Sequence, residues 1–338
     1  MINKPIFFER NRVGRVYTGG KLFHGFFGDK PEDNFFPEEW IASNVKALNK
    51  VMYTEKDGVS KVKDEDIYFD ELLTRYPEKM LGKSGKLRIL VKMLDSAIRL
   101  PAQAHPDKEF SRKHFNSEYG KTESWIIIDK RPGAKIYFGF KDGVTEEVFK
   151  KAIADSETDK DAMERLMESR DVEIGDVYLV PAKEVHAIGA GCLILEIQEP
   201  TDFTVQPEYW CGDYKLNDRE MYINLSKEDA VKCFNFGKAP DTKITAESVI
   251  DENGFKFEKI IDERHTDCFI INKITLDNGS YTPDISDGYG VYIVIEGNGE
   301  ITGDNYSHEL KKGDYFFMPA CAMNKFKISG NLNIIECY

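Results

Sequence analysis

An internal repeat constrains the fold of this chain more than any other feature of its sequence. Residues 175–182 read GDVYLVPA, and residues 313–320 read GDYFFMPA. In both copies the Gly-Asp pair is typical of a turn, an apolar strand follows, and Pro-Ala ends the strand. The repeat predicts two related β domains, and a chain of 338 residues is long enough for two substantial cores. The alternative is two unrelated Gly-Asp turns, because such pairs are common between strands.

Other short segments are also typical of strands, because they are β-branched or aromatic and are bounded by Gly, Asp or Asn. These segments are 125–129, 135–138, 192–198, 269–276, 290–296, 315–318 and 332–337. Their spacing favours barrels or sandwiches. Helical periodicity is confined to 64–81, 107–119 and the charged stretch 145–170, which predicts a small helical insertion at about 142–171 in the first domain.

Composition excludes several classes of protein. A net charge of -13 and a pI near 5.1 argue against nucleic-acid binding, because no basic field exists to neutralise phosphates. The first 15 residues lack the apolar core of a secretory signal, and no apolar run approaches membrane-spanning length. The six cysteines form no CxxC pair, which favours reduced thiols in a cytoplasmic protein.

Four polar residues in three separate segments form a candidate metal site. Gln103 and His105 are two residues apart, so they project from the same face of an extended strand. Glu123 and His186 could complete the set, since two imidazoles, a carboxylate and an amide oxygen suit a divalent transition metal such as zinc. Eleven residues after Gly313 the second copy of the repeat has Asn324 where the first has His186, so only the first domain is expected to bind metal. Histidines packed in the core or exposed on the surface are the alternative.

The motifs around these residues resemble those of type I phosphomannose isomerases, a family of the cupin superfamily. They are LVKMLD at 90–95, QAHPDK at 103–108, GKTE at 120–123, VPA and VHAIG at 180–189, and LEIQ at 195–198. The resemblance is dense between about residues 85 and 205 and weaker elsewhere. It implies a mainly β protein with two cupin-like, jelly-roll barrels: a metal-binding catalytic domain at 1–215 and a second domain at 216–338 without metal ligands.

The resemblance also implies a zinc-dependent isomerase, with one ion per chain, that interconverts mannose 6-phosphate and fructose 6-phosphate through a cis-enediol. It implies that Gln103, His105, Glu123 and His186 are the ligands. For proton transfer the chain offers Glu196, which lies on a strand where Leu193, Leu195 and Ile197 share the opposite face.

Lys121 and Lys92 are the candidate cationic partners for the enediolate or the phosphate, although either could be an ordinary solvated side chain.

Two positions depart from the family pattern. An arginine that usually follows the LEIQ strand is replaced by Gln206, which we keep as a candidate catalytic residue although it carries no charge. A serine that commonly contacts the phosphate is replaced by Pro101.

These departures leave three alternatives open. The first is an isomerase of a different or non-phosphorylated sugar, and the second is a non-catalytic, metal-dependent sugar-binding protein. The third is a mononuclear iron oxygenase, because two histidines and a carboxylate also serve iron. The sequence favours a small-molecule partner, and it is compatible with a monomer or a homodimer.

Overall fold

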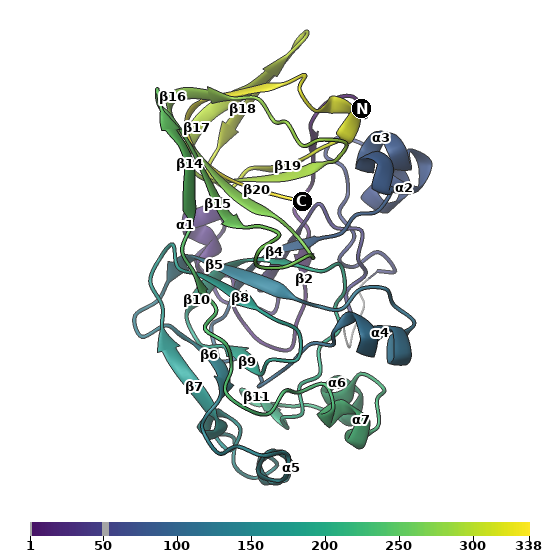
Figure 1. Cartoon of the computed structure of the whole chain (residues 1–338), viewed down its shortest axis with the longest axis vertical. Coiled ribbons are helices and arrows are strands. Elements are labelled where there is room, and N and C mark those ends of the chain that lie inside the picture. The colour runs from purple at the N-terminus through teal and green to yellow at the C-terminus, as the bar shows by residue number, and fades with distance from the viewer. Residues whose placement is uncertain (1, 49–53) are drawn as a thin grey trace.

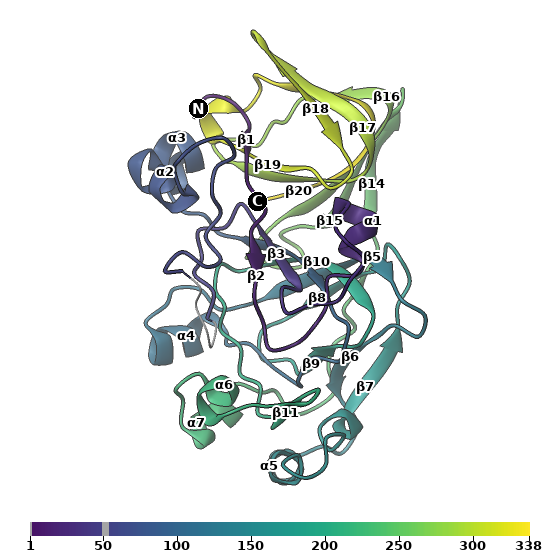
Figure 2. The same ribbon diagram turned by 180° about the vertical axis from the view of Figure 1, so that it is seen from behind.

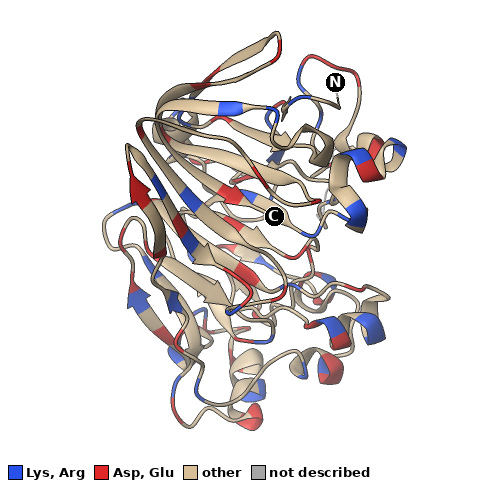
Figure 3. Ribbon diagram, turned by 45° about the horizontal axis from the view of Figure 1, so that its top comes forward, with Lys and Arg blue, Asp and Glu red and all other residues tan. Residues whose placement is uncertain are grey.

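The computed structural model describes residues 2–48 and 54–338, and these residues form a mainly β structure, as the sequence predicts. Two large antiparallel sheets make up most of it, and the helices lie at the periphery (Figure 1). In the reverse view the N-terminal segment passes from one large sheet to the other and pairs with a strand of each (Figure 2). Basic and acidic residues are interspersed along the strands and the peripheral helices (Figure 3).

The first sheet carries the candidate site. Its strands, in hydrogen-bonded order, are β13 (Lys243–Ile244), β8 (Val177–Val180), β5 (Glu123–Lys130), β10 (Cys192–Gln198), β4 (Leu90–Asp95), β3 (Glu38–Ile41) and β2 (Arg12–Val13). A smaller sheet beside it consists of β7 (Met167–Asp171), β6 (Lys135–Phe140) and β9 (His186–Ile188). A short hairpin joins β11 (Trp210–Cys211) to β12 (Tyr214–Lys215).

The second large sheet is built mostly from the C-terminal third of the chain. Its order is β1 (Ile6–Phe7), β19 (Tyr315–Met318), β17 (Gly290–Gly303), β20 (Lys327–Cys337), β16 (Ile271–Tyr281), β15 (Phe255–Ile261) and β14 (Glu247–Glu252), and β18 (Tyr306–Lys311) pairs with β17. Among the described residues, the hydrogen-bonded order of each large sheet ends at edge strands and does not close on itself.

The sequence repeat has a counterpart in the strand order. The path β8-β5-β10-β4 of the first sheet corresponds to β19-β17-β20-β16 of the second, in the same order along the chain. Both turn glycines are left-handed, with φ of +90° at Gly175 and +86° at Gly313, a conformation that favours glycine. In each turn the Asp carboxylate accepts a hydrogen bond from the backbone N–H three residues earlier, at 3.1 Å for Asp176 and 2.9 Å for Asp314. The two Gly-Asp turns therefore share their geometry as well as their sequence.

The two large sheets pack against each other through apolar faces. Leu193, Leu195 and Ile197 of β10 are fully buried, and they belong to one core cluster with Val291 and Ile293 of β17. Burial of each such side chain stabilises the fold by about 1.5–3 kcal/mol. Because side chains alternate along a strand, this packing turns the even-numbered residues of β10 to the other face of the first sheet.

The helices are short. They are α1 (Phe23–Phe27), α2 (Phe69–Arg75), α3 (Pro77–Leu81), α4 (Lys108–Phe115), α5 (Glu146–Asp155), α6 (Asp218–Tyr222) and α7 (Lys227–Val231), with 3-10 turns η1 (Gly82–Ser84), η2 (Glu164–Leu166) and η3 (Ala320–Ala322). The helix predicted over 64–81 is shorter and is divided, because Pro77 cannot continue α2 and instead begins α3. Within the predicted insertion, α5 and η2 are helical, but 167–171 form strand β7. That part of the prediction is wrong, because these residues pair with β6.

Two short strands, one from each predicted half of the chain, pair with the sheet of the other half. Strand β1 pairs with β19 of the second sheet, and β13 pairs with β8 of the first. The division of the chain at residue 215 stays a prediction, and the pairing of β13 ties residues up to Ile244 to the first sheet. In the described part of the chain, no helix combines the length and the apolar character needed to cross a membrane.

Candidate metal centre and active site

Three of the predicted ligands meet beside the first sheet. Glu123 begins β5, His186 begins β9, and His105 lies in the loop between β4 and α4. Their donor atoms all lie within 4.8 Å of one another. The two Nε2 atoms are 3.1 Å apart, and His105 Nε2 is 3.1 Å from a Glu123 carboxylate oxygen. All three residues are buried, with at most 1% of their surface exposed.

Backbone carbonyls orient both imidazole rings. His105 Nδ1 lies 2.8 Å from the carbonyl oxygen of Phe203, and His186 Nδ1 lies 2.9 Å from that of Glu184. A hydrogen on Nδ1 leaves the Nε2 lone pair directed at the centre, which is how ligating histidines are commonly held. Burial lowers the pKa of both rings, that of His186 to about 3, so both are neutral at pH 7. Neutral imidazole is the form that binds a metal.

Gln103 reaches the centre through its backbone. Its N–H donates to the carbonyl of His186 and its own carbonyl accepts from the N–H of His186, both at 2.9 Å. Gln103 is 8% exposed and lies two residues before His105. The structure therefore brings three of the predicted ligands together and holds Gln103 beside His186 through its backbone, while the role of the Gln103 amide as a ligand stays a prediction.

The donor set fits a divalent transition metal. Burial raises the pKa of the Glu123 carboxyl, but the nearby Lys121 ammonium and the two histidines outweigh burial and hold this pKa well below its ordinary value. The carboxylate is therefore ionised. Two neutral imidazoles and one carboxylate on a common centre are a recurrent set for zinc and for other divalent transition metals.

Lys121 lies at the same centre. Its Nζ atom is 2.8 Å from His105 Nε2, pairs with a Glu123 carboxylate oxygen and is 3.6 Å from Glu196 Oε1. Burial lowers the pKa of Lys121, but the surrounding carboxylates raise it above its ordinary value. The structure thus places a buried ammonium group between the predicted ligands and the predicted proton-transfer residue.

Glu196 projects from β10 toward the centre, on the face opposite Leu195 and Ile197. Its Oε1 atom accepts no hydrogen bond and lies 3.6 Å from both Lys121 Nζ and Lys92 Nζ. Burial, together with the negative charge of Glu123, raises the pKa of Glu196. Buried carboxylate oxygens without a donor are uncommon and are concentrated at functional sites.

The predicted residue Gln206 is directed elsewhere. Its side-chain amide donates to the carbonyl oxygen of Glu220 in α6, at 3.1 Å. Its backbone neighbour Val205 pairs with Ala104, so the segment passes close to the ligands. The described contacts of the Gln206 side chain are therefore with a helix and not with the four ligands.

A group of charged residues next to Lys92 could not be recognised from the sequence. Arg15, in the segment after β2, pairs with Glu38 of β3 and with Asp202 in the loop after β10. Burial raises the pKa of Asp202, but Arg15 and Lys92 outweigh this effect and hold the pKa below its ordinary value. The strand sequence EEWI puts one glutamate and one apolar residue on each face, so alternation does not single out Glu38, and no local pattern relates Arg15 to Asp202.

Two further buried carboxylates support the segments that carry the ligands. Glu199 accepts hydrogen bonds from the backbone N–H groups of Gly120 and Thr122, at 3.2 and 3.0 Å. Glu208 accepts one from the N–H of Ala102, at 2.6 Å, and also pairs with an arginine. These bonds fix the backbone on each side of the predicted ligands.

The second sheet has a glutamate in the corresponding place. Glu336 lies on β20 between β16 and β17, as Glu196 lies on β10 between β4 and β5. Its Oε1 atom accepts hydrogen bonds from Tyr281 and Tyr292, at 2.7 and 2.8 Å, and its Oε2 atom accepts one from Asn272 at 2.8 Å. This carboxylate is held by three donors, whereas Glu196 keeps one oxygen without a donor.

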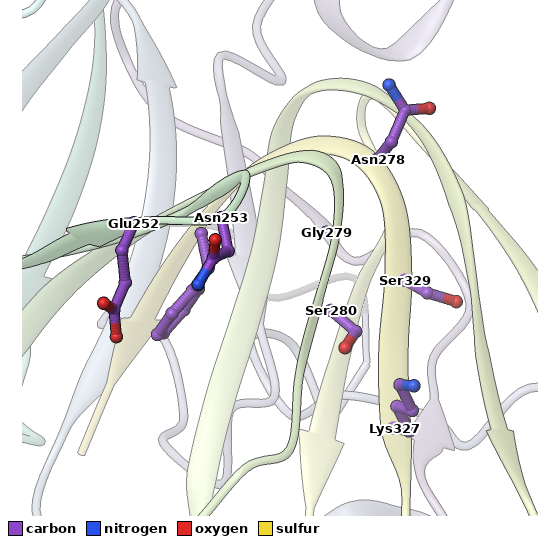
Figure 4. Close-up of a pocket in the computed structure, with 8 residues that line it drawn as sticks. Glu252, Asn253, Asn278, Gly279, Ser280, Lys327 and Ser329 are labelled. Carbon is purple, nitrogen blue, oxygen red and sulfur yellow. The ribbon is translucent and has the colours of Figure 1, made fainter.

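A surface hollow of ≈ 460 Å³ lies at one end of the second sheet, where the β14–β15 turn meets β16 and β20 (Figure 4). Its lining includes Glu252, Asn253, Phe255, Lys327 and Ser329. None of the predicted site residues lines it. The candidate site is therefore defined by the buried cluster on the first sheet and not by this hollow.

Comparison with known proteins links both halves of the chain to one family. Residues 263–338 match the family described as "Mannose-6-phosphate isomerase, cupin domain". The mannose-6-phosphate isomerase ManA of Bacillus subtilis is 30% identical over 251 residues, which cover 73% of this chain and 74% of that protein. The mannose-6-phosphate isomerase of Streptococcus mutans is 27% identical over 341 residues, which cover 99% of this chain and 98% of that protein.

Solved structures show the same fold. The crystal structure of the mannose 6-phosphate isomerase from Bacillus subtilis matches with a TM-score of 0.78 at 24% identity and covers 99% of both chains. A putative mannosephosphate isomerase from Archaeoglobus fulgidus matches with a TM-score of 0.72 at 19% identity. These similarities extend over nearly the whole chain.

Proposed function

The chain belongs to the mannose-6-phosphate isomerase family of type I, within the cupin superfamily, and we propose that it interconverts mannose 6-phosphate and fructose 6-phosphate. The single observation that supports this most directly is the convergence of His105, Glu123 and His186 beside the Glu196 carboxylate oxygen that accepts no hydrogen bond. An aldose–ketose isomerase needs both features, a centre that stabilises negative charge and a base that moves a proton.

We propose that a divalent ion, preferably zinc, is bound by His105, Glu123 and His186 together with the amide oxygen of Gln103. The donor chemistry supports this assignment, because both imidazoles are neutral and oriented and the carboxylate is ionised. When bound, such an ion would polarise the sugar oxygens as a Lewis acid. The proton transfers are assigned to the side chains of the chain itself.

Glu196 is the proposed proton-transfer residue. In the forward direction its carboxylate takes the proton from C2 of the aldose, the electron pair of that C–H bond forms the C1=C2 double bond, and the π pair of the C1 carbonyl moves to O1. A proton then passes from O2 to O1 as C2 becomes the carbonyl, and Glu196 returns its proton to C1, so one group serves as base and then as acid. A raised pKa suits this double role, because a catalytic pKa nearer to the working pH favours both transfers.

Lys121 and Lys92 are the proposed partners of the developing negative charge. Both ammonium groups are buried and lie 3.6 Å from Glu196 Oε1. Once Glu196 has taken up a proton, its charge no longer compensates them, and they can stabilise the enediolate oxygens. Electrostatic stabilisation of this kind is strongest in a buried site that excludes water.

We further propose that the chain is organised as two cupin-type β domains and that only the first binds metal. The common strand order and the common Gly-Asp turns support this organisation. Asn324 replaces the histidine of the first repeat, and the corresponding carboxylate, Glu336, is held by three hydrogen bonds. The pairing of β13 with β8 supports a boundary after Ile244 in preference to residue 215.

A metal-supplemented isomerase assay tests the proposed function. Fructose 6-phosphate should form from mannose 6-phosphate, EDTA should abolish the reaction, and zinc should restore it. Assays of free mannose and other aldoses in parallel show how much the phosphate group contributes to kcat/KM.

Gln206 motivates one alternative, because a neutral amide directed at α6 contributes no charge to the site. A protein that binds the sugar phosphate in the presence of metal but forms no ketose would be a binding protein and would contradict the proposed function. If a non-phosphorylated aldose were turned over at a higher kcat/KM than mannose 6-phosphate, the proposed isomerisation would stand and the proposed substrate would be wrong.

A further inference from the structure

A buried arginine from the N-terminal segment bridges two carboxylates from distant parts of the chain. Arg15 donates to both oxygens of Glu38, at 2.8 and 3.1 Å, and to both oxygens of Asp202, at 3.2 and 3.1 Å. The exposed fractions of these side chains are 15%, 4% and 6%. A planar guanidinium can donate to both oxygens of each of two carboxylates, and a single ammonium group, with three N–H donors, cannot hold both carboxylates in this bidentate way.

Asp202 connects this bridge to the proposed active site. Its Oδ1 atom is 3.6 Å from Lys92 Nζ, and Lys92 Nζ is in turn 3.6 Å from Glu196 Oε1. The ammonium group also lies 4.8 Å from the centre of the Trp40 ring. Lys92 is therefore shared between Asp202, which Arg15 already compensates, and Glu196.

The position of Lys92 depends on that compensation. Without Arg15, the buried carboxylates of Glu38 and Asp202 would lack a positive charge that compensates them, and burial of uncompensated charge is strongly unfavourable. Lys92 is already within 4 Å of Asp202, so it is drawn toward Asp202 and away from Glu196 when Arg15 is absent. Arg15 thus affects the position of the Lys92 ammonium group without contacting it.

We propose that Arg15 is a positioning residue of the isomerase site, which locks Asp202 and Glu38 and thereby keeps Lys92 against Glu196. This inference rests on the proposed function, because it assigns to Lys92 a role in stabilising the enediolate. It predicts that loss of Arg15 impairs turnover more than substrate binding, since the enediolate charge exists only after the proton has been transferred.

Arg12 provides a matched control in the same segment. It pairs with Glu39, the neighbour of Glu38, at 2.7 Å and also with Asp29. Glu39 is fully buried and lies on the opposite face of β3, where it contacts Tyr315 of the second sheet. Arg12 therefore resembles Arg15 in bridging a buried glutamate to an aspartate, but it lies on the side away from the proposed site.

The test compares Arg15→Gln with Arg12→Gln in the zinc-loaded enzyme. Both variants should lower the melting temperature, because each removes the ion-pair partner of a buried glutamate. Only Arg15→Gln should lower kcat for mannose 6-phosphate, by about 10- to 100-fold, the usual effect of removing a partner that orients an active-site group. Its KM should change by less than about 3-fold, a factor worth only about 0.65 kcal/mol of binding.

A second measurement follows Lys92 without relying on turnover. In protein labelled with ¹⁵N-lysine, the side-chain signal of Lys92 is assigned by its loss in Lys92→Arg. This signal should shift in Arg15→Gln and remain unchanged in Arg12→Gln. If Arg15→Gln does not fold, Arg15→Lys replaces it, because it keeps the charge but cannot hold both carboxylates.

The proposal requires both results. An unchanged kcat, or a reduced kcat with an unchanged Lys92 signal, would overturn it, and so would an equal loss of kcat in Arg12→Gln. If the unaltered enzyme does not isomerise mannose 6-phosphate, the proposed function fails. A selective shift of the Lys92 signal would then still support the positional link from Arg15 to Lys92.

Discussion

Replacing Glu196 with glutamine should remove activity and preserve stability, whereas the same replacement at Glu336 should preserve activity and reduce stability. The two glutamates occupy corresponding places in the two large sheets, and both are at least 97% buried. They differ in their partners. Glu196 has an oxygen that accepts no hydrogen bond, and Glu336 accepts three hydrogen bonds.

The expected magnitudes follow from these partners. Loss of a proton-transfer group lowers kcat by about 10²- to 10⁴-fold. The free energy of unfolding should change by less than about 1 kcal/mol in Glu196→Gln. Lys92 still pairs with Asp202 and Lys121 still pairs with Glu123, so both buried ammonium groups retain a carboxylate partner.

In Glu336→Gln, two hydrogen bonds from tyrosines lose a charged acceptor, at about 1 kcal/mol each. The third bond can be preserved, because Asn272 Oδ1 has no partner and its amide can turn to accept from the new glutamine. The total loss of about 2 kcal/mol should lower the Tm of a 338-residue chain by about 3 °C.

Two assays on the same preparations of Glu196→Gln and Glu336→Gln test these expectations. Steady-state kinetics with mannose 6-phosphate gives kcat and KM, and thermal unfolding followed by circular dichroism gives Tm. A Glu196→Gln enzyme with kcat within about 10-fold of the unaltered enzyme would refute the assignment of Glu196 as the proton-transfer group. An equal loss of kcat in Glu336→Gln would show that the activity responds to general damage and not to the local chemistry of Glu196.

Three further predictions concern the surroundings of the centre. His186→Ala should lose bound metal and activity together while the second sheet stays folded, as measured by elemental analysis and circular dichroism; full metal occupancy would contradict the ligand assignment. Glu208→Gln should weaken zinc affinity by about 10- to 100-fold, measured by competition with a chelator, because the Ala102 N–H loses a charged acceptor. Asp202 has a lowered pKa, so its contribution to stability is complete above about pH 4 and is lost as the pH falls further. Urea unfolding should therefore show Asp202→Asn to be destabilising at pH 7, with a difference from the unaltered protein that shrinks below pH 4; a constant difference would exclude this linkage.

Local patterns in the sequence determined the strands and the chemistry of the candidate site. A period of two separates Leu193, Leu195 and Ile197 from Glu196, and the sheet packing preserves this separation. The Gly-Asp turns could be recognised because a left-handed residue followed by a side-chain acceptor has few sequence solutions. Imidazole, carboxylate and amide groups in three separate motifs indicated a metal site because few other arrangements use those donors together.

Only the tertiary structure determined which distant groups meet. Arg15, Glu38 and Asp202 lie in three separate segments, and in the sequence each resembles a solvated surface charge. The same is true of two short strands that pair across the halves of the chain, β1 with the second sheet and β13 with the first. Such contacts depend on how whole sheets pack against each other, and a short segment of sequence contains no information about that packing. The sequence therefore defined the reactive groups, while packing of the sheets determined which charges surround them.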